Sequence, residues 1–316
     1  MSAEMKVYFV RHAQSVNNVL PGDLGSDEFE ARRHPDAPLT DRGVAQTVVA
    51  AKQVVEMVPE ATLILTSYLS RALRTAAVIA DEYHAKREAD ETSEPSTPQV
   101  VVRVCRDIHE VGGSYYRNVE TKSDIGTPGT TSKDVLAAFP AFTFRDGEDC
   151  SAGWWRSDKR EKRVDAEERA MDLYYILCNE FAKGIHKSVV VVTHGDFFRV
   201  LNTTWRKRRV MTPSKGEDSL PPIVNLSNTG ITLFTFRASV PQLLTTSSDA
   251  SNANDEANLS ASPPHSDSQN NSMSRALSAT VTDPDIPCKV ELGFQNDVAH
   301  LSEVGVCDIK HMGRNA

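Results

Sequence analysis

Arginine and histidine side chains follow two short apolar runs of the sequence. Arg11 and His12 come directly after Val7–Val10, and His194 follows Val189–Val192 with one threonine between them. A guanidinium group offers forked hydrogen-bond donors that match the oxygens of a phosphate. If the two runs are neighbouring strands, about 4.8 Å apart, the two histidines approach one small anion from two sides. The residue types therefore predict a phosphate site.

Two further apolar runs lead into polar residues. Leu63–Leu65 precedes a helical pattern that carries Arg71 and Arg74, and Val100–Val102 is followed by a polar segment with Glu110. The two arginines are three residues apart on one helical pattern, so both are candidates for facing the site. Arg71 would complete a ring of two arginines and two histidines. Each charge-assisted hydrogen bond from such a ring to phosphate contributes about 1.5–3 kcal/mol.

The apolar runs predict the elements that position these side chains. All four are short, rich in β-branched residues and bounded by polar ones, which is typical of buried strands in a mainly parallel sheet. Apolar residues at helical spacing lie between them, over 44–58 and 170–181. Strands alternating with helices predict an α/β fold, a three-layer αβα sandwich with a mainly parallel central sheet. Ligands of such folds bind at the carboxyl ends of the strands.

Several motifs resemble those of the histidine phosphatase superfamily, the phosphoglycerate-mutase-like enzymes. The resemblance is carried, in chain order, by Val10–Asn18, Leu39–Gln46, Thr66–Ala76 and Thr193–Gly195. Asn296–Leu301 is similar to a C-terminal segment of some members. Each motif alone is unspecific, but four in this order and spacing are a strong signal. The resemblance spans nearly the whole chain apart from the low-complexity stretch over 239–287.

The resemblance implies a role for each matching side chain. His12 would attack phosphorus and become phosphorylated, and Arg11, Arg71 and His194 would bind the phosphoryl oxygens. Glu110 would give a proton to the leaving group and later take one from water, which a carboxyl group can do if its pKa lies near the working pH. Because the arginines supply positive charge to the transferring group, no metal ion is expected.

Other residues enter the predicted site with less specific roles. Asn18 is expected to orient the attacking histidine or to touch phosphate. Ser15, Gly195 and Arg74 are candidates for supporting the site or contacting substrate, and Glu148 is the alternative candidate for the acid. His109 and the pair Trp154–Trp155 are expected to pack rather than to take part in the chemistry.

The sequence departs from the family pattern at two positions. Ala13 stands where a glycine usually follows the histidine, and Tyr68 stands where a proline is common. The first departure matters only if that position requires a positive φ. Neither departure removes a chemical group.

The preferred reading is a phosphomonoesterase acting on a small phosphorylated substrate, and two alternatives stay open. A cofactor-dependent phosphoglycerate mutase would use the same pocket with 2,3-bisphosphoglycerate, whereas the phosphatase needs no cofactor. Residues 16–18 and 110–114 lack the aromatic-Asn pair and the Tyr-Gly pair by which such mutases hold that cofactor, which favours the phosphatase. The second alternative is a catalytically silent binding module, but this chain keeps the nucleophile and the arginines.

Composition limits the class of protein further. With 35 Lys and Arg against 43 Asp and Glu, the net charge of −8 argues against a nucleic-acid partner. No stretch approaches the ~20 apolar residues that cross a bilayer, and the start of the chain has no signal-peptide pattern. The five cysteines are widely spaced and odd in number, which is typical of reduced thiols. We therefore expect a cytoplasmic protein.

Composition also divides the chain after residue 238. Residues 239–287 are rich in Ser, Asn, Asp, Thr and Pro and almost free of aromatic side chains, which predicts disorder because such a segment buries little apolar surface. Strand-like patterns lie on both sides of it. We expect one catalytic domain over 1–238, a disordered insertion over 239–287 whose protein partners are unknown, a C-terminal strand over 288–303 that completes the domain, and a tail over 304–316.

Overall fold

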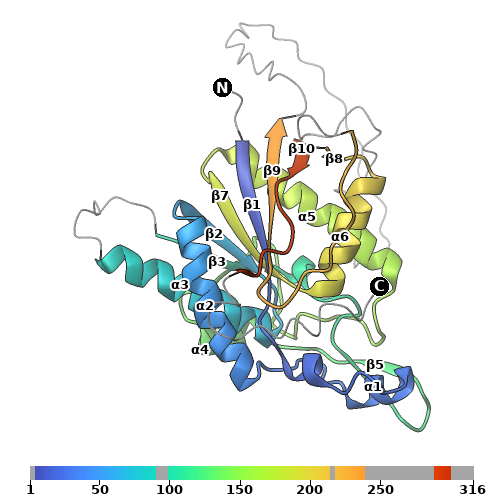
Figure 1. Ribbon diagram of the computed structural model, residues 1–316. Coiled ribbons are helices and arrows are strands. Elements are labelled where there is room, and N and C mark those ends of the chain that lie inside the picture. The colour runs from blue at the N-terminus through green and yellow to red at the C-terminus, as the bar shows by residue number, and fades with distance from the viewer. Residues whose placement is uncertain (1–3, 90–98, 214–217, 239–287, 300–316) are drawn as a thin grey trace, which may run out of the picture.

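An eight-stranded sheet forms the centre of the molecule (Figure 1). The computed structural model describes residues 4–89, 99–213, 218–238 and 288–299. The strand order is β6-β3-β2-β7-β1-β9-β10-β8. Within this described sheet, β9 alone runs against its neighbours. The strands are β1 (Glu4–Arg11), β2 (Ala61–Thr66), β3 (Val101–Val104), β6 (Thr143–Phe144), β7 (Ser188–Thr193), β8 (Met211–Thr212), β9 (Ile231–Ala238) and β10 (Cys288–Leu292).

Helices cover both faces of the sheet. The longer ones are α2 (Asp41–Met57) and α3 (Ser70–Ala89), which pack on one face, and α5 (Arg163–Lys183) and α6 (Gly195–Lys207), which pack on the other (Figure 1). The predicted α/β fold with a mainly parallel central sheet and helices on both sides is thereby confirmed. None of the helices in the described ranges is long and apolar enough to span a membrane.

The strand sequences match this layered arrangement. Every residue of β7 is buried, which explains its continuous valine run, because a central strand covered on both faces needs no polar alternation. Along β1, Val7 and Phe9 enter the core under α5 and α6, whereas Tyr8 and Val10 enter the core under α2 and α3. The two cores therefore follow the two-residue period of the strand.

The apolar pattern over 44–58 covers α2 and its C-cap Val58, and the later members of the pattern, Ala51, Val55 and Val58, are buried. Val44 and Val48 are 47% and 46% exposed. In the first half of the helix the buried face instead carries smaller and polar residues, among them Gly43, Gln46 and Ala50. The physical reason is close packing at the first turn, where Gly43 lies against the carbonyl of Gln14 and leaves no room for a side chain.

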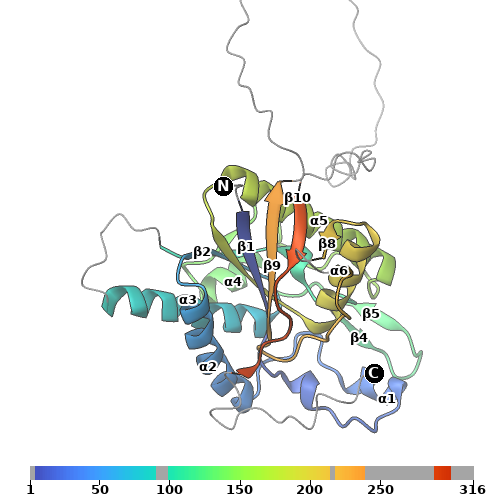
Figure 2. The same ribbon diagram turned by 45° about the horizontal axis from the view of Figure 1, so that its top comes forward.

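Shorter elements gather at the end of the sheet where β1 finishes (Figures 1 and 2). Helix α1 contacts a hairpin of β4 and β5, and the Glu30 carboxylate accepts a hydrogen bond from the Tyr115 hydroxyl at 2.8 Å. These elements are η1 (Val16–Val19), α1 (Ser26–Arg32), η2 (Arg106–Ile108), β4 (Tyr115–Arg117), β5 (Asp124–Gly126) and α4 (Ser132–Ala138).

The chain returns to the sheet after residue 287. β10 pairs with β9 in antiparallel register, with Cys288 opposite Ala238. Residues 239–287 and 304–316, interpreted from composition as an insertion and a tail, lie outside the described residues. The four described cysteines, Cys105, Cys150, Cys178 and Cys288, are buried and free.

Candidate active site

Two histidines meet where parallel strands β1 and β7 end. The register pairs Arg11 with Thr193, and the His12 backbone N–H donates to the Thr193 carbonyl at 2.9 Å. His12 and His194 are therefore next to each other, with ring centroids 5.1 Å apart. Both side chains are buried. The structure brings together the two histidines that the strand ends indicated.

The contacts of His12 define its tautomer. Its Nδ1 lies 2.7 Å from the Ala13 carbonyl, and Arg71 Nε donates to its Nε2 at 3.2 Å. Since a guanidinium can only donate, Nε2 must carry the lone pair and Nδ1 the proton. Burial, reinforced by the charges of Arg71 and Arg11, holds the pKa of His12 well below its usual range. The ring is therefore neutral at pH 7, with Nε2 as its basic atom.

His194 is held from the end of β2. Ser67 Oγ and His194 Nε2 share a hydrogen bond of 2.7 Å. Within the described residues His194 Nδ1 is buried and has no hydrogen-bond partner. Burial and then the charge of Arg71 hold the pKa of His194 well below its usual range.

Two arginines bring positive charge to the histidines. Arg11 Nη1 donates to the Leu226 carbonyl at 2.8 Å, and Arg71 Nη1 lies 4.0 Å from Asp36 Oδ1. Among the described residues, Arg11 Nε and Arg71 Nη1 are buried donors without a hydrogen bond. Burial lowers the pKa of Arg71 to about 10, so its guanidinium stays charged at neutral pH. Buried donors without a hydrogen bond are costly, and the positive charges of both arginines act on His12.

Glu110 lies in the segment after η2 and interacts electrostatically with both arginines. Its carboxylate accepts from the backbone N–H of Val111 at 2.9 Å and from that of Phe197, in the first turn of α6, at 2.8 Å. Burial and then the neighbouring Asp196 raise the pKa of Glu110. The Glu110 carboxylate in turn favours the charged forms of Arg11 and Arg71. The predicted acid therefore lies within electrostatic reach of both arginines.

Glu148, the alternative acid, lies in a different cluster. Both of its carboxylate oxygens accept from the Arg106 backbone N–H, at 3.1 and 3.2 Å. Burial and then Asp107 raise its pKa to about 7. Its neighbours are Cys105 and Asp107, which with Glu148 have potential metal-ligating atoms within 4.8 Å of one another. However, Asp107 already pairs with Arg145 at 2.6 Å, and the Glu148 carboxylate binds the backbone at the start of η2.

Asn18 supports the loop after His12 rather than the ring itself. Its Oδ1 accepts from the backbone N–H and the hydroxyl of Ser15, both at 2.9 Å. The Asn228 side-chain amide donates to Asn18 Oδ1 at 3.2 Å and to the His12 carbonyl at 3.0 Å. Asn18 is thus connected to the His12 carbonyl through the Asn228 amide, and it holds Ser15 in the loop after His12.

The remaining predicted positions differ in their placement. Gly195 lies against Arg11, because a Cβ at this position would be 3.0 Å from Arg11 Cζ. Arg74 is exposed on α3, whereas Arg71 is buried. The structure does not bring Arg74 to the histidines.

The two departures from the family pattern fit this structure. Ala13 is buried and is not among the described residues that have a positive φ, so its methyl group causes no backbone strain. Tyr68 is buried, stacks on Phe144 and shares a 3.3 Å hydrogen bond with the Ser132 hydroxyl.

Sequence reasoning assigned no role to three residues that hold the site. Ser67 binds His194, and Asn228 binds the His12 carbonyl. Thr75 accepts from the Ala13 N–H at 3.2 Å and donates to the Arg71 carbonyl at 2.8 Å. Ser67 follows a predicted strand and could have been found by that position. Asn228 lies in a loop with no pattern of its own.

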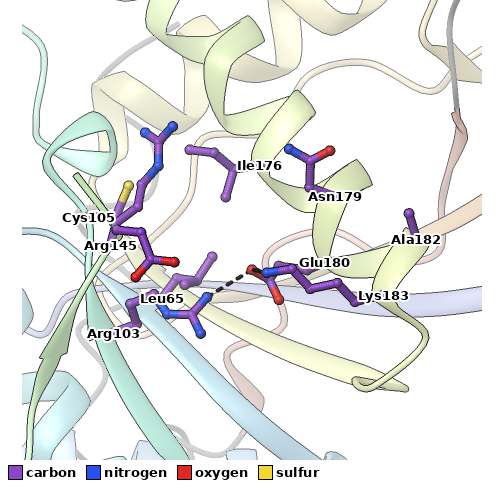
Figure 3. A pocket seen from close by; sticks show the side chains of 10 residues that line it. Leu65, Arg103, Cys105, Arg145, Ile176, Asn179, Glu180, Ala182 and Lys183 are labelled. Carbon is purple, nitrogen blue, oxygen red and sulfur yellow. Dashed lines mark hydrogen bonds and ion pairs between the residues drawn. The ribbon is translucent and has the colours of Figure 1, made fainter. Parts of the chain in front are cut away.

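A separate cavity of about 480 Å³ lies beside α5 (Figure 3). Its wall includes Leu65, Arg103 and Cys105 from the strand side, and none of the histidines. Three charged groups of this wall pair with one another, since Arg103 donates to Glu180 at 2.8 Å and Lys183 donates to the same carboxylate at 2.9 Å. This cavity is therefore distinct from the histidine pocket.

Comparison with known families agrees with the motifs. Residues 7–93 match the family model of the histidine phosphatase superfamily (branch 1). The matched range includes Arg11, His12 and Arg71 and ends before Glu110 and His194. No curated protein matches the sequence.

Solved structures similar to the chain have low sequence identity. Mycobacterial hydrolase 1 is 21% identical over 74% of this chain and 93% of that chain, with a TM-score of 0.43. A mycobacterial glucosyl-3-phosphoglycerate phosphatase is 20% identical over 73% of this chain and 90% of that chain, with a TM-score of 0.41. The ecdysone phosphate phosphatase of Bombix mori is 14% identical over 80% of this chain and 98% of that chain, with a TM-score of 0.43.

Proposed function

We propose that this protein hydrolyses phosphomonoesters through a covalent phosphohistidine on His12. The observation that carries the proposal is the state of the His12 ring. Its Nδ1 proton is donated to the Ala13 carbonyl, which leaves the Nε2 lone pair facing the cationic group of Arg71. A neutral imidazole fixed in one tautomer and surrounded by positive donors suits attack on phosphorus.

In the first step, His12 Nε2 attacks phosphorus and the bond to the ester oxygen breaks. The donors without partners, on Arg11, Arg71 and His194, would bind the phosphoryl oxygens. The Glu110 carboxyl would donate its proton to the departing oxygen, so that an alcohol leaves rather than an alkoxide. The products of this step are the free alcohol, phosphohistidine and the Glu110 carboxylate.

In the second step, water attacks the phosphohistidine. The Glu110 carboxylate takes one proton from the water as the P–N bond breaks, and the His12 lone pair is restored. Inorganic phosphate leaves and Glu110 is again protonated. The two guanidinium groups supply the positive charge that stabilises the transferring group, and the proposed reaction therefore includes no metal ion.

The first test is hydrolysis of p-nitrophenyl phosphate in the presence of EDTA. The wild type is expected to release p-nitrophenol, and His12→Ala to lower kcat/KM by about 10⁴-fold or more because the nucleophile is lost. His84→Ala is the matched control. His84 lies toward the C-terminal end of α3, whereas Arg71 lies in the first turn of that helix. Loss of activity with the chelator would contradict the metal-free reaction, and an active His12→Ala variant would contradict the proposed nucleophile.

The fate of the phosphoryl group separates a phosphatase from a mutase. Incubation with 3-phosphoglycerate and a trace of 2,3-bisphosphoglycerate should yield free phosphate. Interconversion of the phosphoglycerates without phosphate release would indicate the mutase. The intermediate is tested by a brief reaction with ³²P-labelled substrate and denaturation. Label that is stable in base, labile in acid and absent from His12→Ala supports phosphohistidine.

A further inference from the structure

A buried ion pair lies behind the segment that carries Glu110. Arg169 on α5 is 7% exposed, and its Nε and Nη2 donate to the two oxygens of Glu161 at 2.7 and 2.8 Å. Burying two charges carries a desolvation cost that their attraction often only offsets. The pair is therefore weak evidence for stability, and its other contacts must be considered.

Both members of the pair bind the backbone around Glu110. Arg169 Nη1 donates to the carbonyls of Asp107 at 2.7 Å and His109 at 3.0 Å. Glu161 Oε2 accepts from the Gly112 N–H at 3.1 Å. The pair thus holds residues on both sides of Glu110.

The segment needs such support because of its conformation. Gly112 and Gly113 have φ values of 101° and 74°, in the region that favours glycine. No described helix or strand includes residues 109–114, so regular backbone pairing does not fix the direction of Glu110. His109 Nε2, 3.4 Å from Glu161 Oε1, adds one more contact to the same carboxylate.

Arg169 also contacts the second structure that fixes Glu110. Its guanidinium lies over the Phe197 ring, 4.2 Å from the centroid. The Phe197 backbone N–H is the donor to Glu110 Oε1. One guanidinium therefore contacts the loop that carries the carboxyl group and the helix turn that receives it.

We infer that the Arg169–Glu161 pair positions Glu110 for proton donation to the leaving group. This inference rests on the proposed function. The two residues are positioning residues, because their contacts are with the loop and not with the histidine pocket. Arginine suits the role since its planar fork bonds one carboxylate and two carbonyls at once, and lysine cannot reproduce that geometry.

The inference is tested by the leaving-group dependence of kcat/KM, which reports the step that breaks the ester bond. p-Nitrophenolate leaves readily without a proton, whereas the alkoxide of glycerol 2-phosphate needs one. Arg169→Lys keeps the charge and is expected to lower kcat/KM for glycerol 2-phosphate by about 100-fold, the usual range for a lost general acid. Its kcat/KM for p-nitrophenyl phosphate should fall by about threefold or less. Glu110→Gln should show the same selectivity.

Two further variants make the result specific. Arg163→Lys is the matched control, because Arg163 lies on the same helix and is 54% exposed in its pair with Glu167. Arg163→Lys should change kcat/KM by no more than about twofold for either substrate. Glu161→Gln preserves side-chain shape and should reproduce the selectivity of Arg169→Lys if that variant folds poorly, as judged by circular dichroism.

The possible results separate the inference from the proposed function. If Arg169→Lys and Glu161→Gln lost kcat/KM equally for both substrates, the positioning role would be overturned. It would also be overturned if neither variant lost kcat/KM while Glu110→Gln lost it selectively for glycerol 2-phosphate. A wild type that hydrolyses neither substrate would overturn the proposed function and the inference with it. The pH profile adds a readout. In wild type, kcat/KM for glycerol 2-phosphate should fall as pH rises, because Glu110 loses the proton that it donates. Both positioning variants should lose this fall.

Discussion

At the scale of single residues, burial affects the histidines and the acid in opposite chemical directions. It lowers the pKa of His12 and His194, which keeps the rings neutral, and it raises the pKa of Glu110, which favours its protonated form. Burial therefore supports a basic nitrogen and an acidic carboxyl at the same site. This combination is what nucleophilic attack with proton donation requires.

Glu148 gives a stability prediction with a defined sign. Its pKa is raised from the ordinary 4.5 to about 7 in the folded state, so the folded chain binds more protons than the unfolded chain between these values. Stability therefore falls as pH rises from about 4.5 to 7, by an amount on the order of 1–3 kcal/mol. Glu148→Gln should remove this loss while one amide oxygen still accepts from Arg106.

Urea unfolding at pH 5 and pH 8 measures the effect. Wild type should be less stable relative to Glu148→Gln at pH 8 than at pH 5. Asp146→Asn, at a nearby exposed position, serves as the control and should leave the pH dependence unchanged. An identical pH dependence in wild type and Glu148→Gln would show that this carboxyl does not titrate as described.

The residues found from sequence share one property, which is that they follow strands. Arg11 and His12 follow one apolar run directly, and His194 follows another after a single threonine. The parallel arrangement brings these strand ends together. The contacts of Asn228, Arg169 and Glu161 could not be foreseen this way. Their partners depend on the path of loops far away in the sequence, and their own neighbours show no chemical pattern.

At the scale of elements, α2 helps to fix the loop that follows β1. Its first turn is capped by Thr40, whose hydroxyl accepts from the Gly43 N–H at 2.9 Å, and Gly43 packs against the Gln14 carbonyl. Gln46 one turn later accepts from the Gln14 N–H at 2.9 Å. The helix start and the backbone two residues beyond His12 therefore hold each other in place.

Gly43→Ala tests this contact. The added methyl group overlaps the Gln14 carbonyl and should force the loop outward, at a cost of about 1–3 kcal/mol in stability, as for other overpacked sites. It should also lower kcat, because the loop positions His12. Gly22→Ala is the matched control, since a Cβ there has nothing within 4 Å. Thermal unfolding and p-nitrophenyl phosphate kinetics of the two variants provide the comparison, and equal behaviour would contradict the packing argument.

At the scale of the whole molecule, the last described segment reaches the first strand. Asn296 Oδ1 accepts from the Ser227 N–H at 2.7 Å, and its amide donates to the Ser227 hydroxyl at 3.1 Å. Asn228, which follows Ser227 in the chain, binds the His12 carbonyl, and the Thr229 N–H donates to the Arg11 carbonyl at 3.0 Å. Arg11 and Asn296, 285 positions apart in the sequence, thus belong to one connected network.

Substitutions at Asn296 measure that connection. Asn296 has a φ of 52°, so Asn296→Ala loses two hydrogen bonds and also strains the backbone, at a cost of about 2–4 kcal/mol. Asn296→Gly tolerates the conformation and should lose about 1–2 kcal/mol. Chemical denaturation should therefore give the larger loss of unfolding free energy for Asn296→Ala and the smaller loss for Asn296→Gly. The value of kcat should also fall further in the alanine variant. Equal stability of the alanine and glycine variants would argue against strain at this position.

The direction of β9 has a practical consequence. This strand starts with Ile231 beside Val10 and passes Glu4 near its end, so Ala238 lies at the margin of the sheet where β1 begins, a full strand away from the histidines. Ala238 is also exposed. A fluorophore or an affinity handle attached there would be remote from the pocket, which makes this margin a suitable place for immobilising or labelling the protein while its chemistry is assayed.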